Sequence, residues 1–127
     1  MTKPAMRTVH AAQVTPAEFH ILLALVDADR HGYAVMQQVS AESNGTVQLG
    51  PGTLYGAIKR LLEYGYIREV ESRVDPALDD SRRKYYRLTT TGRAAVSAEA
   101  GRLASVVRLA RAKQILTTPA KARGGRP

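Results

Sequence analysis

The hydrophobic period of this sequence changes near Gly65. Before that point, apolar residues recur three and four positions apart in three short segments, which is the spacing of one face of an α-helix. After it, residues 66–71 alternate apolar with charged side chains, and residues 84–88 form a short aromatic and basic run. Both patterns are typical of β-strands. The sequence therefore predicts a mainly α fold with a small β-hairpin.

The first helix has a clear start at Thr15-Pro16-Ala17-Glu18. A threonine N-cap, a proline at the first helical position and a glutamate three residues after the cap form a capping box, which pairs backbone N–H groups that the first turn leaves free. Apolar residues then follow at helical spacing, so we expect a structural helix over about residues 16–28. Residues 1–14 show little periodicity and are interpreted as an N-terminal arm.

Two more helices are expected before the strands. The first runs from about Gly32 to Ser43, and Asn44-Gly45 stops it. The second opens within Leu49-Gly50-Pro51-Gly52-Thr53-Leu54-Tyr55 and ends near Tyr64-Gly65. Its apolar residues gather on one side at 100° per residue. The opposite face then holds Gly52, Thr53, Gly56, Lys59, Arg60 and Glu63, with Tyr55 at the boundary.

The segment between the two strands, residues 72–83, has the Asp, Pro and Ser content of a hairpin loop. Four cations lie on or beside the second strand: Arg82, Arg83, Lys84 and Arg87. The aspartates of the loop would repel phosphate groups. The cations at the start of the strand, and not the loop tip, are therefore expected to contact a phosphate backbone.

A last, long helix is expected from about Gly92 to Leu116, with an N-cap among residues 89–91. Apolar and small residues on it follow the four-three spacing of a heptad seam, which can pair with a second copy of the same helix. These residues are Val96, Ala100, Leu103, Val107 and Ala110. The two alanines weaken the seam, so contacts with another part of the partner are also expected. Packing of the seam against its own domain is the alternative.

The charge distribution indicates a polyanionic partner. Lysine and arginine number 19 against 11 acidic residues in 127, and the net charge of +8 is concentrated toward the C-terminus. Solvated surface charge is the alternative explanation. Without cysteine, the chain cannot form a disulfide, a zinc–cysteine site or an iron–sulfur cluster. The longest apolar run, residues 21–26, is far shorter than a membrane span, so we expect a cytoplasmic protein.

The sequence lacks the residues that enzyme motifs require at their key positions. Gly45 and Gly50 have the separation of a phosphate-binding loop, but Pro51 stands where the lysine of that loop would be. The histidines lie ten or eleven residues apart, which does not place two of them on one helix face as a metal pair. We expect no catalytic residues, no metal site and no cofactor.

Three helices, a two-stranded hairpin and a long helix follow one another in the order of a winged helix-turn-helix domain with an extension, in which the third helix is the recognition helix. Several strings carry a closer resemblance: His31-Gly32-Tyr33, residues 49–55, Lys59-Arg60-Leu61, Gly65-Tyr66-Ile67, and residues 82–89 with Gly92. In this order and at this separation they resemble the PadR family of transcriptional regulators, over about residues 14–92.

The resemblance implies a bacterial DNA-binding domain that dimerises through its C-terminal helices and binds a roughly palindromic operator. The short C-terminal region is similar to that of the small members of the family. The chain has no tryptophan, so the aromatic drug-binding pore that some small members build with tryptophan does not carry over.

We therefore expect a winged helix-turn-helix DNA-binding domain over residues 15–90, a dimerisation helix over 91–116 and a basic flexible tail over 117–127. The expected function is that of a homodimeric repressor that binds a palindromic duplex DNA operator with the third helix and the hairpin, or wing. The residues expected at the DNA are Gly52, Thr53, Tyr55, Gly56, Lys59, Arg60, Arg82, Arg83 and Lys84. A small-molecule effector that binds where the final helices meet the DNA-binding domains is a further hypothesis. The alternative function is a winged-helix module for protein–protein association without specific DNA readout.

Overall fold

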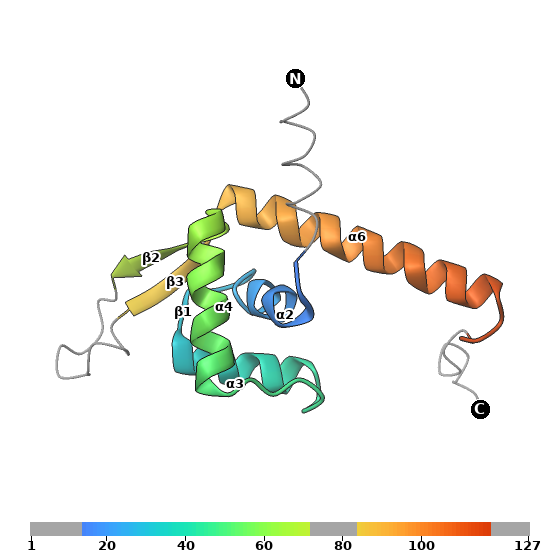
Figure 1. Cartoon of the computed structure of the whole chain (residues 1–127), viewed down its shortest axis with the longest axis horizontal. Coiled ribbons are helices and arrows are strands. Elements are labelled where there is room, and N and C mark those ends of the chain that lie inside the picture. The colour runs from blue at the N-terminus through green and yellow to red at the C-terminus, as the bar shows by residue number, and fades with distance from the viewer. Residues whose placement is uncertain (1–13, 72–83, 118–127) are drawn as a thin grey trace, which may run out of the picture.

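The computed structural model describes residues 14–71 and 84–117. Within these ranges the elements follow in the order α2 (Pro16–Ala24), β1 (Arg30–His31), α3 (Gly32–Glu42), α4 (Pro51–Tyr64), β2 (Ile67–Glu71), β3 (Lys84–Leu88) and α6 (Thr90–Ala112). Helices α2, α3 and α4 and the small sheet form one body, and α6 crosses that body and projects beyond it (Figure 1). The predicted mainly α fold is confirmed. The N-terminal arm, the hairpin loop and most of the basic tail lie outside the described residues.

Helix α2 begins with the predicted capping box. The Glu18 N–H donates to Thr15 Oγ1 (3.1 Å), and the Thr15 N–H donates to Glu18 Oε1 (2.9 Å). The helix ends at Ala24 and not near residue 28. The Arg30 Nε group donates to the Ala24 carbonyl (2.7 Å) and takes the place of a further backbone N–H. The predicted C-terminal end of this helix is therefore wrong.

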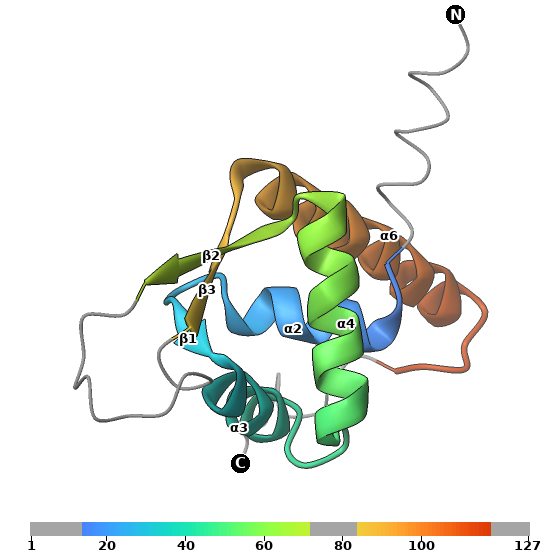
Figure 2. The ribbon, with the colours of Figure 1, turned by 60° about the vertical axis from the view of Figure 1, so that its left-hand side comes forward.

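The β-structure is a three-stranded antiparallel sheet in the order β1-β3-β2, and not the two-stranded hairpin that was expected. The additional strand β1 pairs Arg30 with Tyr86 and His31 with Tyr85. A strand of two residues is too short to show alternation, so no periodicity marks it in the sequence. Figure 2 shows β1 leading directly into α3 beside the hairpin.

Helices α3 and α4 begin and end close to the predicted residues. His31 caps α3 through its Nδ1 atom, which accepts the Ala34 N–H (3.2 Å). Pro51 opens α4, and Gly65 ends it with a φ of 79°, a left-handed conformation that suits glycine. These signals fix the length of the predicted recognition helix at both ends.

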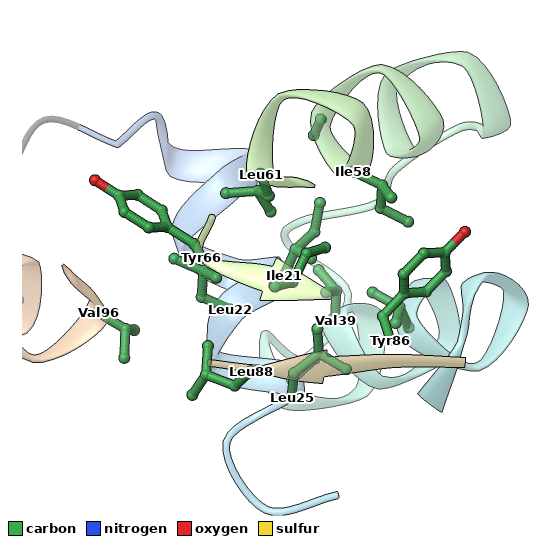
Figure 3. Close-up of a cluster of buried hydrophobic side chains, with 14 of the residues drawn as sticks. Ile21, Leu22, Leu25, Val39, Ile58, Leu61, Tyr66, Tyr86, Leu88 and Val96 are labelled. Carbon is green, nitrogen blue, oxygen red and sulfur yellow. The ribbon is translucent and has the colours of Figure 1, made fainter. Parts of the chain in front are cut away.

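The core forms where α2, α3 and α4 meet the sheet. Among its buried side chains, Ile21, Leu22 and Val39 lie between Leu61 of α4 and Leu88 of β3 (Figure 3). Tyr86 of β3 is also buried. Burial of each large aliphatic side chain contributes about 1.5–3 kcal/mol, so packing can hold this cysteine-free fold together.

The first turns of α6 are part of the same body. Thr89 is the N-cap: its hydroxyl accepts the Gly92 N–H (3.0 Å) and donates to the Gly65 carbonyl (2.6 Å), and its own N–H donates to the Tyr66 carbonyl (3.0 Å). Gly92 lies so close to Tyr66 that a Cβ atom there would overlap the Tyr66 carbonyl oxygen. One turn later, Ala95 is buried. The segment around Tyr66 and the segment around Gly92, which are separate in the sequence, are therefore in direct contact.

Two carboxylates are each bound through both of their oxygens by one arginine. Arg87 donates to both oxygens of Asp29, from Nη2 at 2.8 Å and from Nε at 3.1 Å. Arg102 binds Glu99 in the same way, at 2.6 Å and 3.0 Å. These hydrogen bonds hold the pKa of each carboxyl group below its ordinary value.

Acidification is expected to remove the stability that these pairs contribute. A carboxyl group with a depressed folded-state pKa stabilises the fold above its ordinary pKa, and this contribution is lost as the pH falls below about 4 and through the folded-state pKa. The double variant Asp29→Asn, Glu99→Gln should have a lower urea midpoint than the wild type at neutral pH, and the difference between the two midpoints should shrink as the pH falls from about 4 through the folded-state pKa values. Glu63→Gln, which removes an exposed carboxylate, is the control and should follow the wild type. A midpoint difference that stays constant with pH would contradict this account.

Candidate nucleic-acid interface

Helix α4 turns one face to solvent along its length. Its buried residues are Leu54, Ala57, Ile58 and Leu61. On the other side, Gly56 is half-buried and the remaining members are exposed: Gly52, Thr53, Tyr55, Lys59, Arg60 and Glu63. Figure 2 shows α4 at the front of the body with α2 behind it. The α4 residues expected at the DNA thus lie together on one exposed surface, which with Glu63 we call the α4 surface.

Arg60 lies on a flank of the α4 surface and reaches α2. Its Nε group donates to Oε2 of Glu18 at 2.7 Å. The Glu18 side chain is only 2% exposed, whereas the Arg60 side chain is 45% exposed. The hydrogen bond raises the pKa of the Arg60 guanidinium above its usual range. From the sequence, Glu18 is only the capping glutamate, because no pattern connects positions 42 residues apart.

Tyr55 lies on the opposite flank, against the N-terminal end of α3. Its ring end packs on Gly32, and a Cβ atom at that glycine would come within 2.8 Å of Tyr55 Cζ. Gly32 is buried, so the absence of a side chain there makes room for the tyrosine. In the sequence, His31-Gly32-Tyr33 is the start of a helix. In the structure, its glycine also leaves space for the Tyr55 ring.

A strip of small and charged residues runs between these two flanks. At 100° per residue it contains Gly52, Gly56, Lys59 and Glu63. A Cβ atom at Gly52 would meet nothing within 4 Å, and one at Gly56 would meet only Nη1 of Arg60, at 3.8 Å. The α4 backbone is therefore open to close approach from outside. No carboxylate of residues 14–71 or 84–117 forms an ion pair with Lys59.

The first turn of α4 adds backbone donors to the strip. The N-cap residue Gly50 provides no side-chain hydrogen bond to the helix. The N–H groups of Gly52 and Thr53 have no intrahelical acceptor, because they belong to the first turn. Such groups, together with the positive end of the helix dipole, favour an anionic acceptor.

The hairpin has fewer free cations than its sequence suggests. Arg87 faces Arg68 across the strands β3 and β2, an arrangement that repels. The Asp29 carboxylate binds Arg87 directly and is also attracted to Arg68, which offsets the repulsion. Asp29 was missed from the sequence, since it lies 58 positions from its partner.

The remaining hairpin cations are divided between described and undescribed residues. Lys84 is exposed, with its Nζ atom 4.0 Å from an oxygen of Glu69 on the neighbouring strand. Arg82 and Arg83 lie outside the described residues. Within the described residues, Lys59 is therefore the cation of α4 and β3 without an acidic partner, whereas Arg60, Lys84 and Arg87 each face a carboxylate.

The projecting part of α6 carries most of the predicted seam. Val96 is the exception, because it is buried in the core of its own domain and cannot join a seam. The others are partly or fully exposed: Ala100, Leu103, Val107 and Ala110. Val106, which is 50% exposed, adjoins them on the helix and was missed from the sequence. The side of α6 that packs on the body thus continues as an exposed apolar face, along the part of the helix that projects beyond the body (Figure 1).

Two further searches cover only the described part of the chain. No group of three histidine or acidic side chains there lies close enough together to hold a metal ion. None of the helices there has the length and hydrophobicity needed to cross a bilayer.

Known proteins resemble this chain in sequence and in fold. It is 35% identical over 77 residues to protein X of Lysinibacillus sphaericus, and the alignment covers 61% of this chain and 68% of that protein. A transcriptional regulator of Clostridium thermocellum superposes with a TM-score of 0.63 at 21% identity, covering 91% of this chain and 99% of the other. A PadR family transcription regulator of Clostridium difficile superposes with a TM-score of 0.64 at 23% identity, covering 76% and 96%. These two structures share the fold.

The sequence also matches a family model over most of the described body. The model of the transcriptional regulator PadR-like family aligns with residues 21–98, which is more than half of the chain. The matched segment runs from α2 into the first turns of α6 and includes the whole α4 surface. On this match, and with the winged helix-turn-helix fold in place, the chain belongs to the PadR-like family of transcriptional regulators.

Proposed function

We propose that the protein is a homodimeric repressor that binds a two-fold symmetric duplex DNA operator through the α4 surface of each copy. The observation that carries the proposal is the α4 surface itself. It combines an accessible helix backbone at Gly52 with a lysine that has no acidic partner among the described residues. The major groove of B-DNA, about 12 Å wide, admits an α-helix of this kind.

Five residues of the α4 surface have parts in the proposal that suit their chemistry. The first-turn N–H groups of Gly52 and Thr53 donate to a phosphate, and Lys59 reaches a phosphate or a base edge. Arg60 presents its terminal nitrogens to a base. Tyr55 holds α4 against α3, because the end of its ring packs on Gly32.

The wing retains a supporting part in the proposal. Arg82 and Arg83 are the last residues of the segment that joins β2 to β3, and Lys84 is the first residue of β3, so a wing beside the duplex would bring them to the phosphate backbone. Arg87 is left out, because Asp29 binds its guanidinium. Contacts of this kind position the protein on DNA without reading the sequence.

Dimerisation is proposed through the apolar face of α6. Leu103, Val106 and Val107 are 36%, 50% and 38% exposed on a helix that projects beyond its own body. Pairing with a second copy would bury them, and a two-fold axis places each residue opposite its equivalent. Two recognition helices held in this way read half-sites about one DNA turn, roughly 34–36 Å, apart.

Repression is the regulatory outcome that fits such a complex, because a dimer bound at a promoter excludes other proteins from that DNA. A small-molecule effector would release the dimer only if it favoured a different separation of the two α4 helices. The proposal does not depend on one.

The test of this function is selection from a randomised duplex library by the full chain. Successive rounds should enrich one sequence with two-fold symmetry and half-sites one helical turn apart. A module that only binds proteins would enrich no sequence. That result would contradict the proposal.

Replacement of Lys59 with alanine should weaken DNA binding and leave the fold intact. Affinity for the selected duplex should fall about tenfold, and the plot of log affinity against log salt should become shallower by about two, because each copy loses one phosphate contact. The melting temperature should hardly change, since exposed substitutions alter stability by only about 0.5 kcal/mol. Fluorescence anisotropy over a salt series measures both effects. Lys113→Ala, an exposed lysine just beyond α6, is the matched control, and equal binding by both variants would remove Lys59 from the interface.

A further inference from the structure

Each oxygen of the buried Glu18 carboxylate accepts one hydrogen bond. Oε1 accepts the Thr15 N–H at 2.9 Å, and Oε2 accepts Arg60 Nε at 2.7 Å. With 2% of its side chain exposed, Glu18 has almost no access to water. A buried carboxylate is costly unless it is paired, so Arg60 is held firmly at its Nε atom.

The rest of the Arg60 guanidinium faces outward. Binding through Nε leaves both terminal nitrogens, with four N–H donors, for other acceptors. No acceptor within residues 14–71 or 84–117 takes a hydrogen bond from them. Nη1 lies 3.8 Å from where a Cβ atom would stand on Gly56, so the fork extends over the α4 strip and not away from it.

This arrangement changes what Arg60 can contribute to DNA binding. A free arginine adopts many rotamers, and ordering them opposes binding, whereas Arg60 is ordered before DNA arrives. Glu18 also offsets its charge, so Arg60 adds little to the long-range attraction of phosphates. The contribution of Arg60 to DNA binding is then a pair of hydrogen-bond donors with a fixed position and direction. Lys59, exposed and without an acidic partner among the described residues, has the opposite character.

We infer that Glu18 is a positioning residue for base recognition, which holds Arg60 so that its two terminal nitrogens present a fixed fork to N7 and O6 of a guanine in the major groove. A bidentate contact of this kind with guanine is the commonest specific contact between a protein side chain and a base. The inference rests on the proposed function, because it assigns a task to a residue behind the same surface. Glu18 itself does not touch DNA.

The principal test compares the wild type with Glu18→Gln on the duplex selected by the wild type and on every single base-pair change of it. Glutamine has the same shape and can still accept the Thr15 N–H, but it no longer pairs with Arg60 as an anion. Preference for one G·C pair in each half-site should fall about tenfold, and the other positions should keep their preferences. Binding to a random duplex should not weaken, and its salt dependence should steepen by about one for each copy, because the Arg60 charge is no longer offset.

Two further variants separate positioning from support of the fold. Thr15→Ala removes the hydroxyl that accepts the Glu18 N–H and leaves the Glu18–Arg60 contact in place. It should lower the melting temperature without changing the base-pair profile. Arg60→Lys keeps a cation beside Glu18 but lacks the planar fork, so it should lose preference at the same base pair as Glu18→Gln.

The outcomes decide between clear alternatives. If the folded Glu18→Gln variant keeps the wild-type profile, or weakens every position equally, Glu18 does not position a base-reading group and the inference is wrong. If Glu18→Gln does not fold, Arg60→Lys decides, and a wild-type profile in that variant overturns the inference. A wild-type chain that shows no preference among duplexes overturns the proposed function as well, whereas loss of the inference alone leaves wild-type preference intact.

Discussion

Replacement of Gly92 with alanine is expected to destabilise the protein by at least about 2 kcal/mol, even after the gain in helix propensity. The new Cβ atom would lie within 2.8 Å of the Tyr66 carbonyl carbon and closer still to its oxygen. These are backbone atoms of the residue just before β2, and the same carbonyl accepts the Thr89 N–H. A shift of either backbone segment would therefore be energetically costly. The melting temperature should fall by about 10 °C. Thermal unfolding followed by circular dichroism measures this directly.

Gly101→Ala is the matched control for that substitution. Gly101 lies in the same helix, is exposed, and has nothing within 4 Å of its Cβ position. Alanine there should stabilise the helix by about 0.5–1 kcal/mol. The two variants should therefore shift the melting temperature in opposite directions. Similar shifts for both would mean that α6 does not dock on the β2 strand through Gly92.

Glutamate at both Leu103 and Val107 should convert the proposed dimer to a monomer and reduce operator affinity by about 100-fold or more. Two like-charged carboxylates from each copy would have to be buried in the proposed seam, which is costly. Loss of the dimer separates the half-sites, so each copy must bind alone. Both residues are exposed in the single chain, so the fold should be retained. Sedimentation velocity and DNA titration measure the two effects.

The same charge placed on the back of α6 serves as the control for the seam. Ala98 and Ser105 are exposed and lie opposite Leu103 and Val107 on the helix. The double variant Ala98→Glu, Ser105→Glu should remain dimeric and bind the operator as the wild type does. A variant with glutamate at positions 103 and 107 that still sediments as a dimer would place the interface elsewhere.

The parts of the fold that could be predicted depend on local chemistry. The capping box at Thr15 and the left-handed Gly65 act within a few residues of themselves, so the start of α2 and the end of α4 could be predicted from the chain alone. The exposed face of α4 followed from the helical period, because four apolar residues determine which side is buried.

The parts that could not be predicted are contacts between distant residues. Glu18 and Arg60 are 42 positions apart, and Asp29 and Arg87 are 58 positions apart. Each of these side chains, taken alone, looks like an ordinary exposed charge or a cap. The pairs change the expected interface, because Arg60 becomes an oriented donor and Arg87 is withdrawn from the free cations of the hairpin.

Val96 shows a different limit of a periodic pattern. Residues that pack on the domain and residues of the proposed seam share one side of α6, so the heptad spacing continues from one set into the other without a break. The body of the domain ends between Val96, which is buried, and Ala100, which is exposed. Only the tertiary fold determines where along the helix that change occurs.

The most direct test of the central claim is an anisotropy titration of the full-length chain against the selected duplex and against a scrambled duplex of the same composition, repeated over a salt series. The account predicts that at physiological salt the selected duplex binds about a thousandfold more tightly than the scrambled one, with two chains on each duplex. Both affinities should fall steeply as salt rises, because phosphate contacts release counterions. Equal affinity for the two duplexes at physiological salt would contradict it.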